Sequence, residues 1–466
     1  MTNSTTSSTA KKCLVIGAGL SGLTLAYRLQ KAGLTVSVWE KENRTGGAVG
    51  SGRQDGILWE SGPNSGMDTS PAIGDLLADL KITELRVNAN KIADRRFIVK
   101  NKQLHPLPMS GGAFFSTPLF SLSTKLGLMR EPFIPRSSPE VDESVAGFVR
   151  RRLGTEFLDY AIEPFVSGIF AGDPETLSVQ AAFPKLFALE QRYGGLIRGL
   201  ILGARERKRR AEKSKNNAKS FAFKDGMQTL TDTLTKALAD VKTGVTVHAV
   251  ARQENGSWCA TATRAGESLD ETFDVVAIAT PTEAAAALLQ PFASNEAVSA
   301  LNAITYAPVS ILVSAWRRET IPHPLDGFGY LIPKVEHTAT LGTLFSSAMF
   351  PYRADADHAV LTTFVGGMRH PELPGKSDDD LKTMESDDLR ALLGIKTPPL
   401  WTRISRHPRA IPQYTFGHLD RVARVEAVKK SHPGIFFCAN WRGGIAFSDC
   451  IKNGYAVAEE IAGFLR

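Results

Sequence analysis

A glycine-rich turn near the N-terminus constrains the fold of this chain more than any other feature. Residues 11–17 are KKCLVIG, residues 20–33 carry apolar side chains at helical spacing, and residues 34–40, LTVSVWE, form a second apolar run. A strand, a glycine turn, a helix and another strand make a βαβ unit, which opens a parallel sheet covered by helices. The sequence therefore predicts an α/β fold that begins with a Rossmann-like unit.

The turn also has the glycine spacing of a dinucleotide-binding site. The three glycines of GAGLSG are Gly17, Gly19 and Gly22. The first allows a tight turn, the second lets the backbone approach a pyrophosphate, and the third lets the helix pack closely on the strand. The helix N-terminus, with the amides of Leu20 and Ser21, favours phosphate charge. Glu40 ends the second strand, where a carboxylate accepts hydrogen bonds from ribose hydroxyls.

Two further glycine pairs favour FAD over a nicotinamide cofactor. Gly46 and Gly47 follow Glu40 in RTGG, and Arg44 of the same stretch is expected to offset phosphate charge. Gly443 and Gly444 precede the last predicted helix, whose N-terminus would stabilise negative charge on a reduced flavin. Either pair alone fits an ordinary turn. Together they predict a flavin, because an NAD site has no use for the second helix.

The rest of the chain predicts three parts and a tail. Residues 1–10 are polar and lack the apolar segment of a secretory signal, so a disordered tail and a cytoplasmic location are expected. Prolines and helical segments around 145–160 and 181–202 predict a helical insert at 106–220. Strand-like runs predict a mixed-sheet substrate domain from 91–105 and 301–419. The FAD-binding domain is expected from 11–90, 221–300 and 420–466.

The charge and the cysteine content of the chain exclude few classes of protein. The net charge of +7 suits an anionic substrate without specifying one. The basic run at residues 204–220 is interpreted as a solvated loop or a frayed helix end. The four cysteines form no CxxC pair and have no nearby histidine cluster, so no metal site is predicted. No stretch approaches the roughly 20 apolar residues of a spanning helix, so any membrane contact would be peripheral. No nucleic-acid partner is expected.

Longer motifs resemble the protoporphyrinogen oxidase family of the flavin amine oxidase superfamily. The motifs are WESGPNS at 59–65, RFIVKNKQLHPLP at 96–108, IEPFVSGIFAGDPETLSVQAAFPKLFALEQRYGG at 162–195, GFGYLIPKVEHTATLGTLFSSAMFPYRA at 327–354, TTFVGG at 362–367 and ANWRGG at 439–444. The resemblance covers nearly the whole chain after the tail. It implies an FAD-binding domain, a substrate domain and a helical membrane-associated domain. The implied activity is oxidation of protoporphyrinogen IX to protoporphyrin IX in haem biosynthesis.

The resemblance also assigns substrate contacts. The family's propionate-binding arginine falls on Arg96, and a guanidinium suits that role because its planar fork holds a carboxylate with two hydrogen bonds. Because Arg95 is adjacent, an alignment with the family shifted by one residue would assign this role to Arg95. The apolar residues that hold the tetrapyrrole in the family fall on Leu331, Leu344 and Phe364, and a glycine whose backbone approaches the substrate falls on Gly168. Ordinary core packing is the alternative for the apolar three.

The remaining implied contacts concern the cofactor and partners. Further FAD contacts are expected at Lys41, Gly62, Pro63, Asn64, Ser65, Val250, Asn440, Ile445 and Ala446. The family implies six electrons removed in three flavin cycles with dioxygen as acceptor. It is also compatible with a homodimer that contacts the inner face of the cell membrane. No acid or base is predicted, because hydride transfer to a flavin needs no side-chain nucleophile.

The sequence leaves alternatives for the substrate, for the class of protein and for the membrane contact. A related enzyme would oxidise coproporphyrinogen III to coproporphyrin III, and another oxidase similar to the flavin amine oxidases would fit less well. A non-enzymatic carrier such as the GDP dissociation inhibitors shares the fold without FAD, and the intact glycine motifs argue against it. Residues 111–128, GGAFFSTPLFSLSTKLGL, predict an apolar face beside basic residues that lies on a bilayer. Packing of that segment inside its domain is the alternative.

Overall fold

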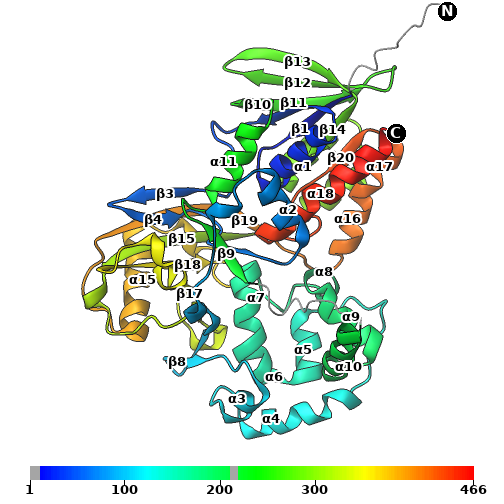
Figure 1. Ribbon diagram of the computed structural model, residues 1–466. Helices are drawn as coiled ribbons and strands as arrows, with labels where there is room; N and C mark the ends of the chain where they lie inside the picture. The colour runs from blue at the N-terminus through cyan, green and yellow to red at the C-terminus, as the bar shows by residue number, and fades with distance from the viewer. Residues whose placement is uncertain (1–10, 210–218) are drawn as a thin grey trace, which may run out of the picture.

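A five-stranded parallel sheet organises the upper part of the molecule in Figure 1. Its order is β10 (Asp240–Thr243), β2 (Thr35–Glu40), β1 (Lys12–Ile16), β14 (Val275–Ile278) and β20 (Ile435–Phe437), and every neighbouring pair is parallel. The central strands are buried on both faces. Helices pack on one face, and antiparallel strands at 245–273 with helices at 282–302 pack on the other. Helix α1 (Leu20–Lys31) connects β1 to β2, and α18 (Phe447–Phe464) packs against it. The predicted βαβ unit is confirmed.

Smaller antiparallel sheets surround this one. The predicted hairpin is formed by β11 (Val245–Arg252) and β12 (Trp258–Arg264), and β13 (Glu267–Phe273) extends it. Strands β3 (Ser51–Gln54) and β4 (Ile57–Glu60) form a second hairpin. Strands β5 (Gly66–Met67), β9 (Ser220–Phe223) and β6 (Arg86–Asn88) form a third sheet.

A seven-stranded mixed sheet lies beside α15 (Asp378–Leu393) at the left of Figure 1. Its order is β19 (Trp401–Pro412), β15 (Tyr306–Arg317), β18 (His358–Gly366), β17 (Thr340–Leu344), β16 (Gly329–Leu331), β7 (Phe97–Lys100) and β8 (Gln103–Pro106). Only β16 and β7 pair in parallel. Residues 97–106 therefore join a sheet whose other strands come from 306–412.

Helices fill the lower right of Figure 1, and with the loops between them they form what we call the helical lobe. They are α3 (Gly111–Ser116), α4 (Leu122–Gly127), α5 (Val145–Leu153), α6 (Thr155–Phe157), α7 (Glu163–Phe170), α8 (Val179–Ala182), α9 (Pro184–Tyr193) and α10 (Leu196–Arg209), with the short helices η3 (Leu128–Phe133) and η4 (Leu158–Ile162). The two predicted helices are interrupted, because Gly154 ends α5 and Gly194 ends α9. Among the helices described here, none is long and apolar enough to cross a membrane.

The remaining helices cover the two large sheets. They are α2 (Pro71–Asp79), α11 (Gln228–Ala237), α12 (Thr282–Leu289), α13 (Asn295–Asn302), α14 (Ser346–Met349), α16 (His418–Glu426) and α17 (Val428–Ser431). The computed structural model describes residues 11–209 and 219–466. The predicted disordered tail at 1–10 and residues 210–218 of the basic run lie outside the described residues. The preceding part of that run, residues 204–209, belongs to α10.

Candidate functional site

The three glycines of the first turn have different surroundings. Gly17 has a φ of +106°, and a Cβ there would lie 2.9 Å from the carbonyl oxygen of Ala279. A Cβ on Gly22 would lie 2.1 Å from the carbonyl oxygen of Gly17, because α1 sits directly on the turn. Around Gly19, by contrast, no described atom comes within 4 Å of such a Cβ. Protein fills the space at the first and third glycines and leaves it open at the second, where a pyrophosphate would approach.

The N-terminus of α1 completes an anion site. Gly19 is the N-cap, no described side chain caps it, and the first turn carries no acidic residue. Free amides and the helix dipole therefore favour a phosphate there. Glu40 accepts hydrogen bonds from the amide of Ala18 (2.7 Å) and of Glu42 (3.0 Å) through different oxygens. Each oxygen keeps a further lone pair for a ribose hydroxyl, so these residues fit a dinucleotide.

Two later loops stack on this turn. The amide of Gly46 donates to the carbonyl oxygen of Ala18 at 2.8 Å, and a Cβ on Gly47 would lie 3.2 Å from the Cα of Gly19. A Cβ on Gly62 would lie 1.9 Å from the carbonyl oxygen of Ala48. The fold thus brings the predicted segments at 17–22, 46–47 and 62–65 together, although they are separated along the chain.

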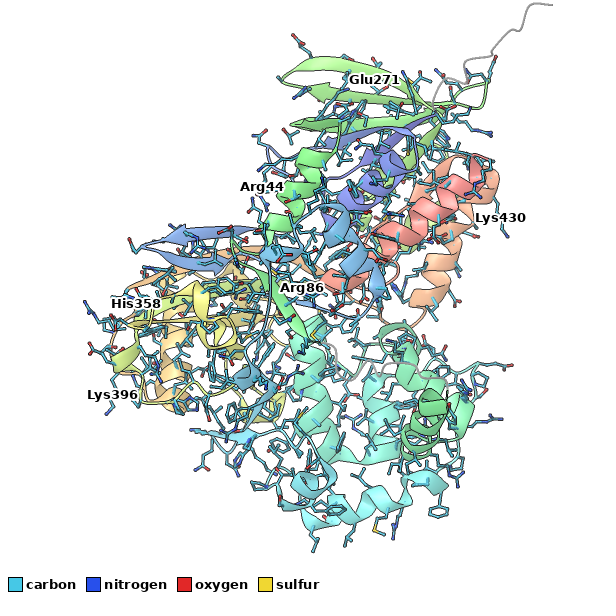
Figure 2. The ribbon with its side chains drawn as sticks, viewed as in Figure 1. Arg44, Arg86, Glu271, His358, Lys396 and Lys430 are labelled. Carbon is cyan, nitrogen blue, oxygen red and sulfur yellow. The ribbon has the colours of Figure 1, made fainter. Side chains whose placement is uncertain are left out.

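Arg44 bonds to the glycine loop that follows it. Its guanidinium donates to the carbonyl oxygens of Val49 (3.0 Å) and Gly47 (2.5 Å), and Figure 2 shows it beside α11. The glycine loop turns these carbonyls toward the guanidinium, whose donors are arranged in a fork. Arg44 therefore holds its own loop in shape, and its contact with a phosphate stays a prediction. Lys41 pairs at the surface with Glu42 at 3.7 Å.

Asn64 is fixed by residues that the sequence analysis did not single out. Its side-chain oxygen accepts from Arg353 (2.9 Å) and Ser346 (3.3 Å), and its main-chain oxygen accepts from Arg353 (2.6 Å). Arg353 also pairs with Glu60 at 3.4 Å. Burial raises the pKa of Glu60 to about 7, although Arg353 opposes the shift. The available signal was one charged residue in each of two family motifs, since Glu60 lies in WESGPNS and Arg353 in MFPYRA.

The C-terminal glycine turn places a second helix N-terminus in the same region. Gly443 and Gly444 have φ values of +87° and +115°, and α18 follows without a side-chain cap. Asn453 donates to the carbonyl oxygens of Ala439 and Arg442 at 3.1 Å each and so holds the turn. Gly454 brings α18 against Thr24 of α1. Asn440, Ile445 and Ala446 lie in or just after this turn.

Val250 is the predicted cofactor residue that fits its role least well. It lies in β11, paired with Ala260, and its side chain is buried in a core cluster with Ile16 and Trp39. Apolar packing therefore explains the side chain completely. Only the main chain of Val250 is left to contact a ligand. Pro63 and Ser65 lie in the loop around Asn64 and are half-buried.

The predicted apolar substrate residues share one face of the seven-stranded sheet. Leu331 and Phe364 are both cross-strand partners of Gly342, and Leu344 is the partner of Gly329. Since alternate residues of a strand face the same side, the register places all three together. They are half-buried. Each of these residues is preceded by one that faces α15 and is buried, namely Tyr330, Thr343 and Thr363. The face that carries the leucines and the phenylalanine is therefore partly open.

Helix α7 covers the open face, which we call the substrate face: Leu331, Leu344 and Phe364 on the sheet and Gly168 on α7. A Cβ on Gly168 would lie 2.9 Å from Cδ2 of Leu331, so the helix approaches the sheet closely there. Gly168 lies within α7 and not in a turn. Ser346 bonds to both Asn64 (3.3 Å) and Thr362 (2.8 Å), and Thr362 is the cross-strand partner of Leu344. The substrate face thus adjoins the loop that carries Asn64.

The two arginines before β7 have different partners. Arg95 forms an ion pair with Asp326 and stacks on Phe97 at 5.1 Å. Arg96 stacks on Phe328 at 5.0 Å and forms no ion pair with any described carboxylate, and burial lowers its pKa. Strand alternation places Arg96 on the side of Ile98, the parallel partner of Leu331. The geometry favours Arg96 over Arg95 for binding a carboxylate at the substrate face.

The family follows from a comparison with known proteins. Residues 20–462 match the family described as flavin containing amine oxidoreductase. The chain belongs to that family. As a flavin-containing amine oxidoreductase it is an FAD-dependent enzyme, in agreement with the two helix N-termini and the open space at Gly19. The cofactor prediction is confirmed, and the carrier alternative is excluded.

Individual relatives of this flavin-containing amine oxidoreductase are similar over their whole lengths. Protoporphyrinogen oxidase 2 of Arabidopsis thaliana is 34% identical, with 98% of this chain and 94% of that protein covered. Coproporphyrinogen III oxidase of Bacillus subtilis (strain 168) is 27% identical, with 98% of each covered. A crystal structure from Exiguobacterium sp. 255-15, provisionally named protoporphyrinogen oxidase, is 26% identical, has a TM-score of 0.81, and covers 97% of this chain and 99% of its own. The resemblance found in the motifs is confirmed.

Proposed function

We propose that this enzyme oxidises protoporphyrinogen IX to protoporphyrin IX in haem biosynthesis. The observation that carries the proposal is the substrate face, a half-buried apolar wall with the unpaired guanidinium of Arg96 at its margin. A tetrapyrrole is a large flat apolar ring with carboxylates at its edge, and such a ligand needs apolar walls and one or two fixed cations. The similarity to protoporphyrinogen oxidase of Arabidopsis thaliana supports the same substrate.

Each residue of the substrate face has a binding task in this mechanism. Arg96 would hold a propionate and so fix the ring in its own plane. Leu331, Leu344 and Phe364 would hold one side of the ring, and the close approach of α7 at Gly168 would limit access of water. Bound FAD supplies a two-electron acceptor, and three cycles remove the six electrons, with dioxygen as the proposed final acceptor.

Cofactor binding is proposed to use the residues assembled around the glycine turn. The amides of α1 would bind the pyrophosphate, Glu40 the ribose, and the turn at 440–446 the flavin. The division into an FAD-binding part, a substrate part and a helical insert, with the limits given above, is part of the proposal. The two large sheets support this division, because strands of the proposed FAD-binding part form the five-stranded sheet and strands of the proposed substrate part form the seven-stranded sheet.

Coproporphyrinogen III is the second candidate substrate, because coproporphyrinogen III oxidase of Bacillus subtilis is similar over nearly the whole chain. The deciding experiment records the visible spectrum of the purified protein and its turnover of both porphyrinogens by porphyrin fluorescence. A yellow protein that prefers protoporphyrinogen IX supports the proposal. A yellow protein that prefers coproporphyrinogen III would make the second candidate the substrate and reject the first. A yellow protein that oxidises neither would reject both.

We also propose that the enzyme acts in the cytoplasm with its helical lobe against the inner face of the cell membrane. Large apolar side chains are exposed on and around α3, α4 and η3: Met109, Phe115, Leu122, Leu126, Met129 and Phe133. Clustered apolar exposure of this kind is typical of a monotopic contact. The segment departs from the sequence expectation in one respect, because Lys125 is buried and donates to the carbonyl oxygens of Phe115 and Thr117.

A homodimer is likewise proposed and can be tested by analytical ultracentrifugation.

A further inference from the structure

Residues 413–418, which we call the crossing segment, run from the end of β19 to the start of α16 and contact several parts of the molecule. The side-chain amide of Gln413 donates to the carbonyl oxygen of Phe170 at 2.8 Å, at the C-terminal end of α7. The amide of Gly417 donates to Asp142 at 2.7 Å in the helical lobe. Tyr414, between them, reaches the turn before α18. One short segment therefore touches α7 on one side and the glycine turn on the other.

The hydroxyl of Tyr414 holds two main-chain groups of the glycine turn. It donates to the carbonyl oxygen of Asn440 at 2.5 Å and accepts from the amide of Gly444 at 3.1 Å. Gly444 has a φ of +115°, and a Cβ on it would overlap Asp449, so the turn has little conformational freedom left. Tyr414 is buried, and without its hydroxyl both half-buried main-chain groups would lose this partner. The hydroxyl therefore fixes the shape of the turn.

The ring of Tyr414 is itself held in one orientation. It stacks on His418 with 4.0 Å between the ring centres and packs edge-on against Phe170 at 5.8 Å. Its main-chain oxygen accepts from the amide of Ser178 at 2.9 Å. Burial, with Arg421 nearby, lowers the pKa of His418 to about 4, so the imidazole is neutral near pH 7 and stacks as an uncharged ring. Burial also raises the pKa of Tyr414, which keeps the proton that it donates to Asn440.

We propose that Tyr414 and Gln413 are positioning residues, which together form a brace between the flavin-facing turn at 440–444 and the α7 wall of the substrate face. Both contacts come from adjacent residues of one strand end, so they fix the two walls of the site relative to each other. The assignment of the two walls rests on the proposed function. The two contacts are separable, because Tyr414 acts on the cofactor side and Gln413 on the substrate side.

The cofactor side is tested with Tyr414→Phe, which keeps the ring and removes the hydroxyl. FAD titration of the apoprotein is expected to show about tenfold weaker binding, the effect of losing a buried hydrogen-bonding group. The midpoint potential of bound flavin is expected to fall, because the α18 N-terminus that stabilises the reduced form is held less firmly. A purely structural role would lower the melting temperature of the apoprotein and leave the potential unchanged.

Tyr306→Phe is the matched control. The Tyr306 hydroxyl accepts from the amide of Thr282 at 3.1 Å, at the start of α12, so this variant also loses one partly buried hydroxyl bond. It is expected to keep the flavin affinity and potential of the wild type. Wild-type affinity and potential in Tyr414→Phe would overturn the brace, and so would an equal change in both variants.

The substrate side is tested with Gln413→Leu, which removes the bond to Phe170 and a second one to the carbonyl oxygen of Ile411 (2.9 Å) at nearly constant volume. The KM for the porphyrinogen is expected to rise about three- to tenfold while FAD affinity stays at the wild-type value, since one hydrogen bond to α7 is lost. An unchanged KM would overturn this half of the brace. If wild-type protein binds FAD but oxidises no porphyrinogen, the proposed function fails, and the Tyr414→Phe titration still decides the cofactor half.

Discussion

Arg96 and Arg95 are adjacent in the sequence and differ in what they contact. Arg95 is neutralised by Asp326, whereas Arg96 has no ion-pair partner among the described residues. A carboxylate bound by a guanidinium contributes about 1.5–3 kcal/mol. Arg96→Ala is therefore expected to raise the KM for protoporphyrinogen IX by roughly ten- to a hundredfold without loss of flavin. Steady-state porphyrin fluorescence measures the KM, and the visible spectrum measures the flavin.

Two variants control this prediction. Arg96→Lys should recover part of the affinity, because an ammonium keeps the charge and lacks the planar fork. Arg95→Ala should change the KM little, since it loses an ion pair with Asp326 and its stacking on Phe97, neither of which involves the substrate face. Normal turnover in Arg96→Ala together with failure of Arg95→Ala would mean that the two residues exchange roles.

Single residues were predictable from the sequence where their task is local. Gly17, Gly19 and Gly22 act within one turn, so their spacing alone indicated the site. Arg353 and Asn64 meet across 289 positions, and Tyr414 reaches Gly444 only because β19 ends beside the C-terminal turn. No local pattern carries such contacts. For the same reason the bonds of Arg44 to its own loop were not predicted.

At the scale of elements, the first glycine turn gives opposite expectations for two of its glycines. Space is open around Gly19, so Gly19→Val should leave the apoprotein folded with an unchanged melting temperature and abolish FAD binding. Gly22→Val should instead lower the melting temperature strongly, because its side chain would meet the carbonyl oxygen of Gly17. Thermal unfolding and FAD titration of both apoproteins separate the two effects. A Gly19→Val protein that retains FAD would contradict the pyrophosphate position.

Helix α15 carries a buried carboxyl that links stability to pH. Burial raises the pKa of Glu385 to about 7 from 4.5, and its strongest contact is the hydroxyl of Ser314 at 2.6 Å. A raised pKa means that its stabilising contribution is complete below about pH 4.5 and is lost as the pH rises through about 7. Glu385→Gln stays neutral and should be more stable than the wild type at pH 8, by ~3 kcal/mol at most.

Denaturant unfolding of the two apoproteins at pH 5 and pH 8 measures this difference. The gain should shrink toward zero at pH 5, where the wild-type carboxyl is protonated. Asp379→Asn, on the exposed side of the same helix, should show no such dependence. An equal stability difference between Glu385→Gln and the wild type at both pH values would contradict the raised pKa.

Elements with strong local patterns were predicted well, and their pairing less so. The strands at 12–16, 35–40 and 275–278 are rich in apolar residues and were predicted as strands. The helices near 145–160 and 181–202 were predicted as longer than they are, because Gly154 and Gly194 were not taken as ends. The parallel pairing of β7 with β16 has no local signal, yet it places Arg96 beside Leu331. That juxtaposition came only from the family resemblance.

At the scale of the whole molecule, the helical lobe ends in exposed apolar side chains on α3, α4 and η3, at the bottom of Figure 1. Met129 and Phe133 on η3 are 66% and 80% exposed. Burying a Met or Phe side chain contributes about 1.5–3 kcal/mol. The double variant Met129→Ser and Phe133→Ser is therefore expected to reduce binding to phospholipid vesicles by about a hundredfold or more, with normal FAD content and normal turnover of dispersed substrate.

Flotation with vesicles of neutral lipid and of mixed neutral and anionic lipid measures this binding. Leu419→Ser is the matched control, because Leu419 is 53% exposed on α16, outside the helical lobe. It should float like the wild type. Since Lys125 is buried, the contact is expected to depend on apolar area more than on charge, so added salt should release little protein from either vesicle. Wild-type protein that stays in the soluble fraction with both vesicles at low salt would mean that these side chains serve another purpose than membrane contact.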